Sequence, residues 1–151
     1  MREILFKAKR IDNGEWVEGS YLYCKNATTV SFRNEHYILV FDGYGVAYHE
    51  IDKDTICRYT GLTDKNGNKI WENDVVKKHF YTDYDAYANS EEYVGIVKFT
   101  DCAWVIDTKR NEYVCTRPIF ESMAYSKDVD YFEVIGNIFD NPELLKGGGA
   151  E

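Results

Sequence analysis

The residues of this chain whose types and spacing could do chemistry begin at Asp64. Side-chain oxygens alternate at Asp64, Asn66 and Asn68, as they do at the first, third and fifth positions of a calcium-binding loop. Gly67, however, comes at the fourth position of this series instead of the sixth, and Val75 stands where a bidentate glutamate should close the site. We therefore predict a plain β-hairpin turn here, with no metal bound.

Asn66 and Gly67 are the strongest turn signal in the chain. They have the composition of a two-residue hairpin turn, in which both central residues need a positive φ, and Asn and Gly adopt it at the smallest cost. Residues 55–60 alternate apolar and polar side chains before this turn, and residues 74–78 form a further predicted strand after it. We predict two strands joined by a tight loop.

Glu72 and Asp74 form a second set of residues whose spacing could support catalysis. They lie two positions apart on a segment that we predict to be a strand, so their side chains would share a face and could form a coupled acid–base pair. Such a pair would suit a hydrolase, but glycoside chemistry requires two carboxylates set across a sugar, and the sequence nominates no further partner. We expect instead that Asp74 accepts backbone N–H bonds at a turn.

The cysteines and glycines give no cofactor motif. Cys24, Cys57, Cys102 and Cys115 are far apart, without a C-x-x-C pair or a histidine at a zinc-ligand interval. The glycines at 147–149 have no predicted strand before them and no helix after them, so they do not form a phosphate loop. We expect reduced thiols, no cofactor, no metal and no catalytic residues.

Charge and composition narrow the class of partner. The chain of 151 residues carries a formal net charge of −8, which opposes nucleic-acid binding because counterion release requires clustered Lys and Arg. Aromatic residues reach 16%, and thirteen of them are Tyr, which suits half-exposed strands or a recognition surface. The N-terminus has no apolar signal core and no run is long enough to span a bilayer, so we expect a cytoplasmic protein without membrane contact.

One loop combines this acidity with these tyrosines. It alternates Tyr with Asp and ends in two glutamates, and Tyr rings offer a large contact area at a small entropic cost. We predict either a solvated loop or an interaction surface that suits basic partners or a second copy of the chain. The candidate surface consists of Tyr81, Asp83, Tyr84, Asp85, Tyr87, Glu91 and Glu92.

Short β-forming runs recur about every 8 to 12 residues with turn chemistry between them, which is typical of a barrel or a sandwich. The predicted hairpins join residues 3–10 to 16–23, 28–32 to 37–41, and 103–107 to 111–115 through a loop at 108–110. Residues 93–99 and 132–138 are further strands, residues 118–125 form a strand or a helical turn, and Pro142 opens a terminal helical turn. We predict a mainly β fold of short antiparallel strands and hairpins with little helix.

Four motifs occur in a fixed order along the chain: Arg2 with Phe6, Lys7 and Ala8, and the segments 14–19, 60–76 and 133–145. Together these motifs resemble the YopX family, small proteins of phages and prophages in Gram-positive bacteria. The resemblance implies a β-dominated fold with a C-terminal SH3-like barrel and a molecular function that is not established, so it supplies no catalytic residues. Where such chains usually read Glu-Gly-Asp, this one has Glu72-Asn73-Asp74, and Asn is the side chain best able to replace Gly at a positive φ.

The expected organisation is an N-terminal β-rich lobe at 1–71, a C-terminal SH3-like barrel lobe at 72–146 and a tail at 147–151. The leading hypothesis is a phage or prophage accessory protein that binds a host or phage protein without catalysis, in the cytoplasm of the bacterial host cell. The alternatives are an acidic nucleic-acid mimic that inhibits a host DNA-handling protein and, least favoured, the hydrolase that uses Glu72 and Asp74. Exposed edge strands also leave a homo-oligomer open.

Overall fold

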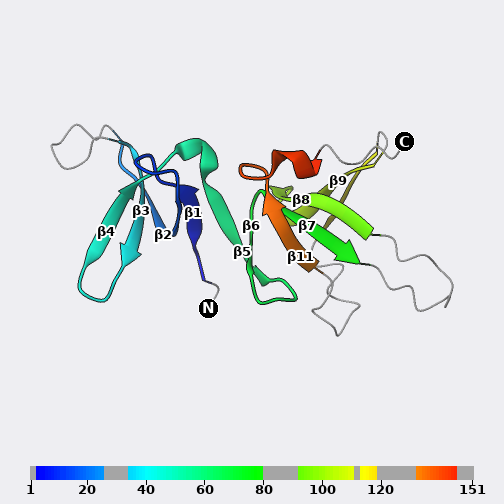
Figure 1. The fold of residues 1–151 in the computed structure, drawn as a ribbon, viewed down its shortest axis with the longest axis horizontal. Coiled ribbons are helices and arrows are strands. Elements are labelled where there is room, and N and C mark those ends of the chain that lie inside the picture. The colour runs from blue at the N-terminus through cyan, green and yellow to red at the C-terminus, as the bar shows by residue number, and fades with distance from the viewer. Residues whose placement is uncertain (1–2, 26–33, 80–91, 111–112, 119–131, 146–151) are drawn as a thin grey trace. The chain divides into compact units, whose positions relative to one another are not determined.

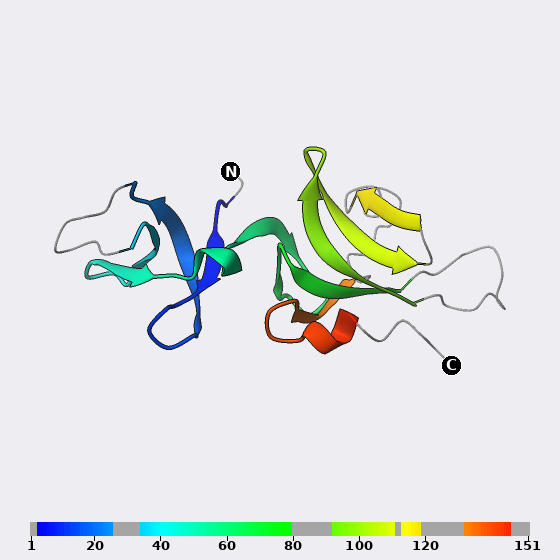
Figure 2. The ribbon, with the colours of Figure 1, turned by 90° about the horizontal axis from the view of Figure 1, so that it is seen from above.

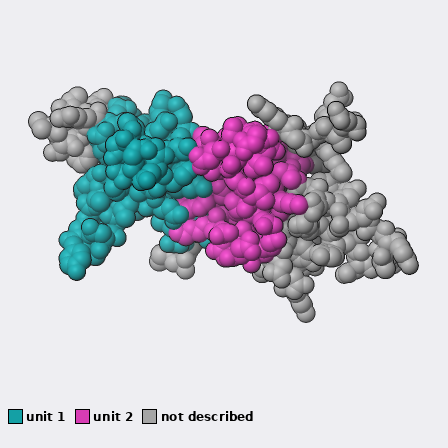
Figure 3. Space-filling model, in the orientation of Figure 1, with its two compact units in different colours: residues 1–61 teal, residues 62–151 magenta. Residues whose placement is uncertain are grey.

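The computed structural model describes residues 3–25, 34–79, 92–110, 113–118 and 132–145 (Figure 1). The chain forms two compact units, residues 1–61 and 62–151, which Figure 3 draws in different colours. This division falls ten positions before the boundary that we placed at 71/72 from the sequence. The strands, in chain order, are β1 (Phe6–Lys9), β2 (Trp16–Tyr23), β3 (His36–Phe41), β4 (Val46–Glu50), β5 (Cys57–Thr63), β6 (Lys69–Trp71), β7 (Asp74–His79), β8 (Glu92–Thr100), β9 (Ala103–Arg110), β10 (Tyr113–Pro118) and β11 (Phe132–Asn137).

Unit 1 is built on an antiparallel sheet. Its strands lie in the order β4-β3-β2-β1-β5, within a six-stranded sheet whose last member is β6. The first hairpin has the predicted strands, with Phe6 opposite Gly19 and Lys9 opposite Trp16. Ala8, Ile38 and Ile51 are fully buried and form the centre of the core. A 3₁₀ turn, η1 (Lys53–Thr55), separates β4 from β5.

Unit 2 holds the second antiparallel sheet, of order β10-β9-β8-β7-β11. Side chains from several of its strands, and from β6, pack into one core, because alternate positions on each strand point to the same face. The buried members of this core are Ile70, Val76, Val97, Trp104, Ile106 and Phe132. The chain then ends its described part in a second 3₁₀ turn, η2 (Pro142–Leu145), at the predicted helix-opening proline.

The prediction of a mainly β, antiparallel fold with little helix is confirmed for the part of the chain that the structure describes. β10 and β11 are the two end strands of the second sheet, and no pairing within the described ranges joins them. The SH3-like closure of a barrel therefore stays a prediction. Neither of the two short helical turns in the described residues is long enough to cross a membrane.

One tight hairpin turn lies at a position that the sequence did not reveal. Asp101 and Cys102 have φ values of +50° and +63°, and the flanking Thr100 and Ala103 are paired, which makes this a two-residue hairpin turn. Figure 2 shows β8 and β9 side by side, joined by this narrow turn. Neither residue is Gly or Asn, so the turn chemistry that marks such turns was absent.

One predicted loop was wrong. Residues 108–110 belong to β9, whose pairing with β10 continues as far as Arg110 opposite Tyr113. This segment is a strand with polar residues. The spacing of apolar residues and the overall polarity do not distinguish such a strand from a loop. The predicted strand at 28–32, the segment 119–125 and the tail at 147–151 lie outside the described residues.

Candidate functional site

The loop at residues 64–68 carries the side-chain oxygens that resemble a calcium-binding series. It is organised by the Asp64 carboxylate. Its Oδ1 accepts the backbone N–H of Asn66 at 2.9 Å and that of Asn68 at 2.8 Å. Its Oδ2 accepts the Asn68 side-chain amide and the backbone N–H of Val134, both at 3.1 Å. Asp64 is only 4% exposed. Four donors therefore converge on one buried carboxylate, and one of them comes from a strand 70 positions away.

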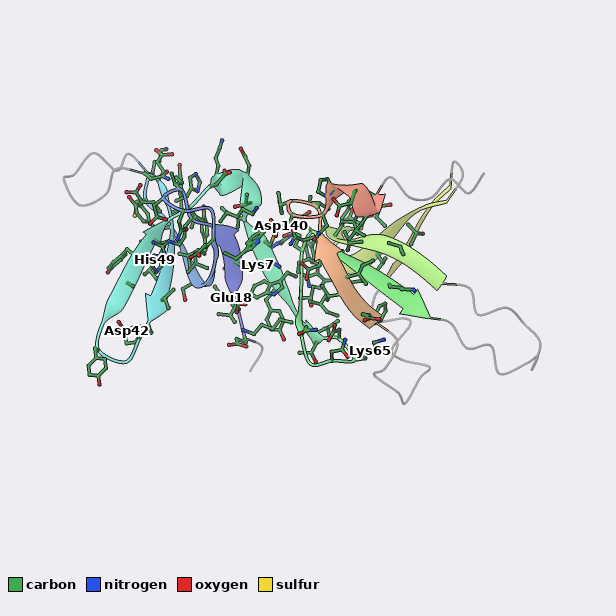
Figure 4. All side chains as sticks on the ribbon, viewed as in Figure 1. Lys7, Glu18, Asp42, His49, Lys65 and Asp140 are labelled. Atoms are coloured by element: carbon green, nitrogen blue, oxygen red, sulfur yellow. The ribbon has the colours of Figure 1, made fainter. Side chains whose placement is uncertain are left out.

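A backbone hydrogen bond and an ion pair of Lys65 also connect this segment to β11. The backbone N–H of Lys65 donates to the carbonyl of Phe132 at 3.0 Å, and the Lys65 ammonium lies 2.7 Å from the Glu133 carboxylate. Figure 4 labels Lys65, which lies in the loop between β5 and β6. The turn at 64–68 thus joins the start of unit 2 to its last strand.

The turn itself differs from the prediction. Gly67 has a φ of +82°, but Asn66 does not have a positive φ, so the expected two-residue turn was wrong. The loop closes instead through Gly67 N–H to the Asp64 carbonyl at 3.0 Å and Asp64 N–H to the Asn68 carbonyl at 2.8 Å. Such a longer hairpin loop needs positive φ only at its glycine. The Asp64 side chain supports this loop by binding the two asparagine N–H groups.

The electrostatics of Asp64 follow from these bonds. Burial alone would raise the pKa of this carboxyl group, but the hydrogen bonds from Val134, Asn68 and Asn66 outweigh burial and hold the pKa below its ordinary value of 3.8. Asp64 is thus ionised at neutral pH with N–H hydrogens directed at both oxygens. A cation would compete with these donors for the same lone pairs.

Asp74 and Asn73 form a second turn, between β6 and β7. The Asp74 Oδ2 accepts the backbone N–H of Trp71 at 2.8 Å, and Asp74 is 2% exposed. The predicted role of Asp74 at a turn is confirmed. Asn73 has a φ of +68°, so the prediction that Asn replaces Gly at a positive φ is confirmed as well. Its N–H donates to the Val97 carbonyl at 2.8 Å.

Glu72 does not share a strand face with Asp74, and that prediction was wrong. β6 ends at Trp71 and β7 begins at Asp74, so Glu72 is a turn residue. The alternation of side chains across a strand applies only to extended backbone, and a turn breaks it. The described side chains contain no group of three or more His, Cys, Asp or Glu arranged to hold a metal ion.

The acidic tyrosine loop lies almost entirely outside the described residues. Tyr81, Asp83, Tyr84, Asp85, Tyr87 and Glu91 all fall between β7 and β8 in that gap. Glu92 is described as the first residue of β8, paired with His79. The proposed role of this loop as an interaction surface stays a prediction.

The structure shows an exposed aromatic surface that the sequence analysis missed. Phe41 is 79% exposed, Tyr44 is fully exposed, and Tyr48 is 52% exposed. We call these three residues the hairpin patch, because they come from β3, β4 and the turn between them. The available signal was the apolar run at 37–41, which does not alternate and therefore places apolar side chains on both faces of β3.

The tip of this hairpin has a defined conformation. The Asp42 Oδ1 accepts the backbone N–H groups of Tyr44 at 2.9 Å and Gly45 at 2.8 Å, and Gly43 has a φ of +88°. These bonds lower the pKa of the Asp42 carboxyl group. Figure 4 labels Asp42 at the end of the β3–β4 hairpin.

The fold and these turns define an antiparallel β protein of two units in which aspartates bind backbone N–H groups at turns. The family model described as YopX protein matches residues 5–146, nearly the whole chain, and the chain therefore belongs to the YopX family. A comparison with curated proteins found no match.

Among solved structures, the chain is similar to protein EF1440 from Enterococcus faecalis. The two share 21% sequence identity with a TM-score of 0.49, and the match covers 96% of this chain and 99% of that one.

Proposed function

We propose that this protein is a non-catalytic protein-binding module and that the hairpin patch is part of its contact surface. One observation carries the proposal. Phe41, Tyr44 and Tyr48 expose large aromatic side chains on one hairpin, and aromatic residues are enriched in the cores of protein interfaces. Figure 3 shows the same hairpin projecting from the body of unit 1.

The pairing within the hairpin places Phe41 and Tyr48 of the patch on a common face. Phe41 is opposite Val46, and Leu39 is opposite Tyr48, so these four side chains lie on the same side of the sheet. The core residue Ile38 alternates with them and points to the other side. The patch therefore adds exposed apolar area outside the core of unit 1, and such area is stabilised when a partner covers it.

Charge indicates the class of partner. The chain carries a net charge of −8, so electrostatic attraction favours a partner with a basic surface. The acidic tyrosine loop around Tyr81, Tyr84 and Tyr87 has the composition of a second, separate contact surface. An SH3-like closure of unit 2 is part of the same proposal. The likeness to YopX proteins supports a setting in the cytoplasm of a bacterial host that carries a phage or prophage.

Affinity purification with quantitative mass spectrometry tests this proposal. The bait proteins are the wild type, a patch variant, a loop variant and a control with one exposed apolar residue of unit 1 changed. The patch variant combines Phe41→Ser, Tyr44→Ser and Tyr48→Ser, and the loop variant combines Tyr81→Ala, Tyr84→Ala and Tyr87→Ala. The control is Ile4→Ser, because Ile4 is 76% exposed in the wild type.

We expect a partner that the wild type and Ile4→Ser retain and that the patch variant loses. Isothermal titration with the purified partner should then show a dissociation constant raised at least ~10-fold by the patch variant, equivalent to ~1.4 kcal/mol. Circular dichroism and the Tm must show that the variant is folded. A partner lost only by the loop variant would refute the role of the patch, and partners retained by every variant would refute both surfaces.

A further inference from the structure

Unit 1 contains a surface pocket of about 540 Å³ that none of the predicted functions uses. It lies where the end of β1, the start of β3 and the corner between β4 and η1 meet. The side chains that matter for its chemistry are Lys9, Arg10, Asn34, His36, Asp52 and Lys53. Its volume is in the range of pockets that bind small molecules.

The charge of this pocket is opposite to that of the chain. In the described part of unit 1 there are six Lys and Arg and nine Asp and Glu. The pocket is lined by three of those basic residues, Lys9, Arg10 and Lys53, but by only one acidic residue, Asp52. This local excess of positive charge in an acidic protein favours a small anion over a long polyanion, since the surrounding surface repels the latter.

The contacts leave part of that charge uncompensated. The Asp52 Oδ1 accepts the Asp54 backbone N–H at 3.0 Å, so this oxygen caps η1. The Arg10 guanidinium is held by Asp12, with Nε at 3.0 Å from Oδ1. Lys53, in contrast, has no ion-pair partner among the residues that the structure describes. A ligand anion would supply the missing countercharge.

Further polar side chains line the same pocket. The Tyr21 hydroxyl lies 2.7 Å from the His36 Nδ1, a hydrogen bond that orients the imidazole ring. The ring has a second nitrogen, Nε2, that can hydrogen-bond a ligand. Asn34 adds a side-chain amide, whose Nδ2 lies 3.4 Å from the Ile51 carbonyl oxygen and keeps a second N–H. Amide, imidazole and cationic groups together suit an acceptor with several oxygens.

We propose that this pocket binds a phosphate group, either as inorganic phosphate or as the phosphomonoester of a small molecule. Lys53 supplies the uncompensated charge, and His36 and Asn34 supply directional hydrogen bonds. The site is separate from the hairpin patch, because none of Phe41, Tyr44 and Tyr48 lines it.

Two-dimensional ¹⁵N NMR at constant ionic strength tests the proposal. The ¹⁵N-labelled full chain is titrated separately with inorganic phosphate, glycerol 3-phosphate and citrate. Lys53→Gln is the informative variant, because no described carboxylate loses an ion pair with it. Lys25→Gln is the matched control, since Lys25 is an exposed lysine of the same unit outside the pocket.

We expect saturable shifts confined to residues 9–14, 34–36 and 51–53, and a dissociation constant that Lys53→Gln raises about fivefold, equivalent to ~1 kcal/mol. Lys25→Gln should leave it unchanged. Tighter binding of glycerol 3-phosphate than of phosphate would identify the phosphomonoester as the ligand class, and the reverse order would identify free phosphate. Shifts spread over the chain, citrate binding as tightly as the phosphates, or equal weakening by both variants would overturn the proposal.

Discussion

Replacement of Asp64 by Asn is the sharpest test of the turn at residues 64–68. The carboxylate accepts four N–H donors, two on each oxygen, from Asn66, Asn68 and Val134. The amide of Asn has one acceptor oxygen, so two of these donors would face an NH₂ group instead of an oxygen. We expect unit 2 to fold with the same topology but with lower stability.

The magnitude follows from the lost bonds. Hydrogen bonds to charged groups contribute ~1.5–3 kcal/mol, and a buried donor left unsatisfied costs ~1–3 kcal/mol. Because the two effects overlap, we expect Asp64→Asn to reduce the free energy of unfolding by ~3 kcal/mol. With an m-value of ~2 kcal/mol/M, the midpoint of urea unfolding should fall by ~1.5 M.

The assay has to report on unit 2 alone. Trp71 and Trp104 are buried in unit 2, whereas Trp16 is in unit 1, so the variants are made in a Trp16→Phe background and followed by tryptophan fluorescence. Glu143→Gln is the control, because it removes one charge from an exposed residue whose carboxylate accepts a long hydrogen bond, of 3.4 Å, from the Asn141 amide. It should shift the midpoint by less than ~0.25 M.

The pH dependence gives a second readout of the same substitution. The folded-state pKa of Asp64 is below its ordinary value of 3.8, so its ionisation stabilises the fold above that pH and the contribution is lost as pH falls through the folded pKa. The difference in stability between wild type and Asp64→Asn should be constant near neutrality and shrink below pH 3.8. A loss no larger than that of Glu143→Gln, or a difference independent of pH, would refute this account of the turn.

Substitutions at three further sites test the backbone arguments by urea unfolding. Asn73→Gly should raise the stability of unit 2 by ~1 kcal/mol because φ is +68° there, and Asn73→Ala should lower it by a similar amount; a stabilising Ala would contradict this. Exchanging Asp101-Cys102 for Asn-Gly should add ~1–2 kcal/mol, since both positions have a positive φ, whereas unchanged stability would mean that the turn is not strained. Gly19→Ala should destabilise unit 1 by ~1–3 kcal/mol, as its Cβ would lie 2.1 Å from the Leu39 carbonyl oxygen; normal stability would show that the strands can separate there.

Much of the local structure could be predicted from the sequence. The strands β1, β2, β8 and β11 were expected from runs of β-forming residues bounded by turn residues, and the η2 turn from its proline. The positive φ of Asn73 was also expected, because the preference of Asn for this region depends on the residue itself. These features are determined by interactions within a few positions of the chain.

The candidate site was predicted less well, because its geometry depends on distant partners. Asn66-Gly67 has the composition of a two-residue turn, yet the Asp64 carboxylate holds a longer loop in which only Gly67 has a positive φ. Glu72 was predicted to lie in a strand, but β6 ends one residue earlier, at Trp71. The end of a strand depends on where its pairing with other strands stops. Local composition does not contain either piece of information.

The sequence by itself determined the class of fold, the family and the chemistry of individual turns, since propensities and spacing act locally. Only the tertiary structure decided that Asp64 binds Val134, a residue that strand pairing brings near although 70 positions separate them. It also decided that Ile38 is buried while Phe41, three residues later, is exposed, because burial depends on which faces and strands pack together.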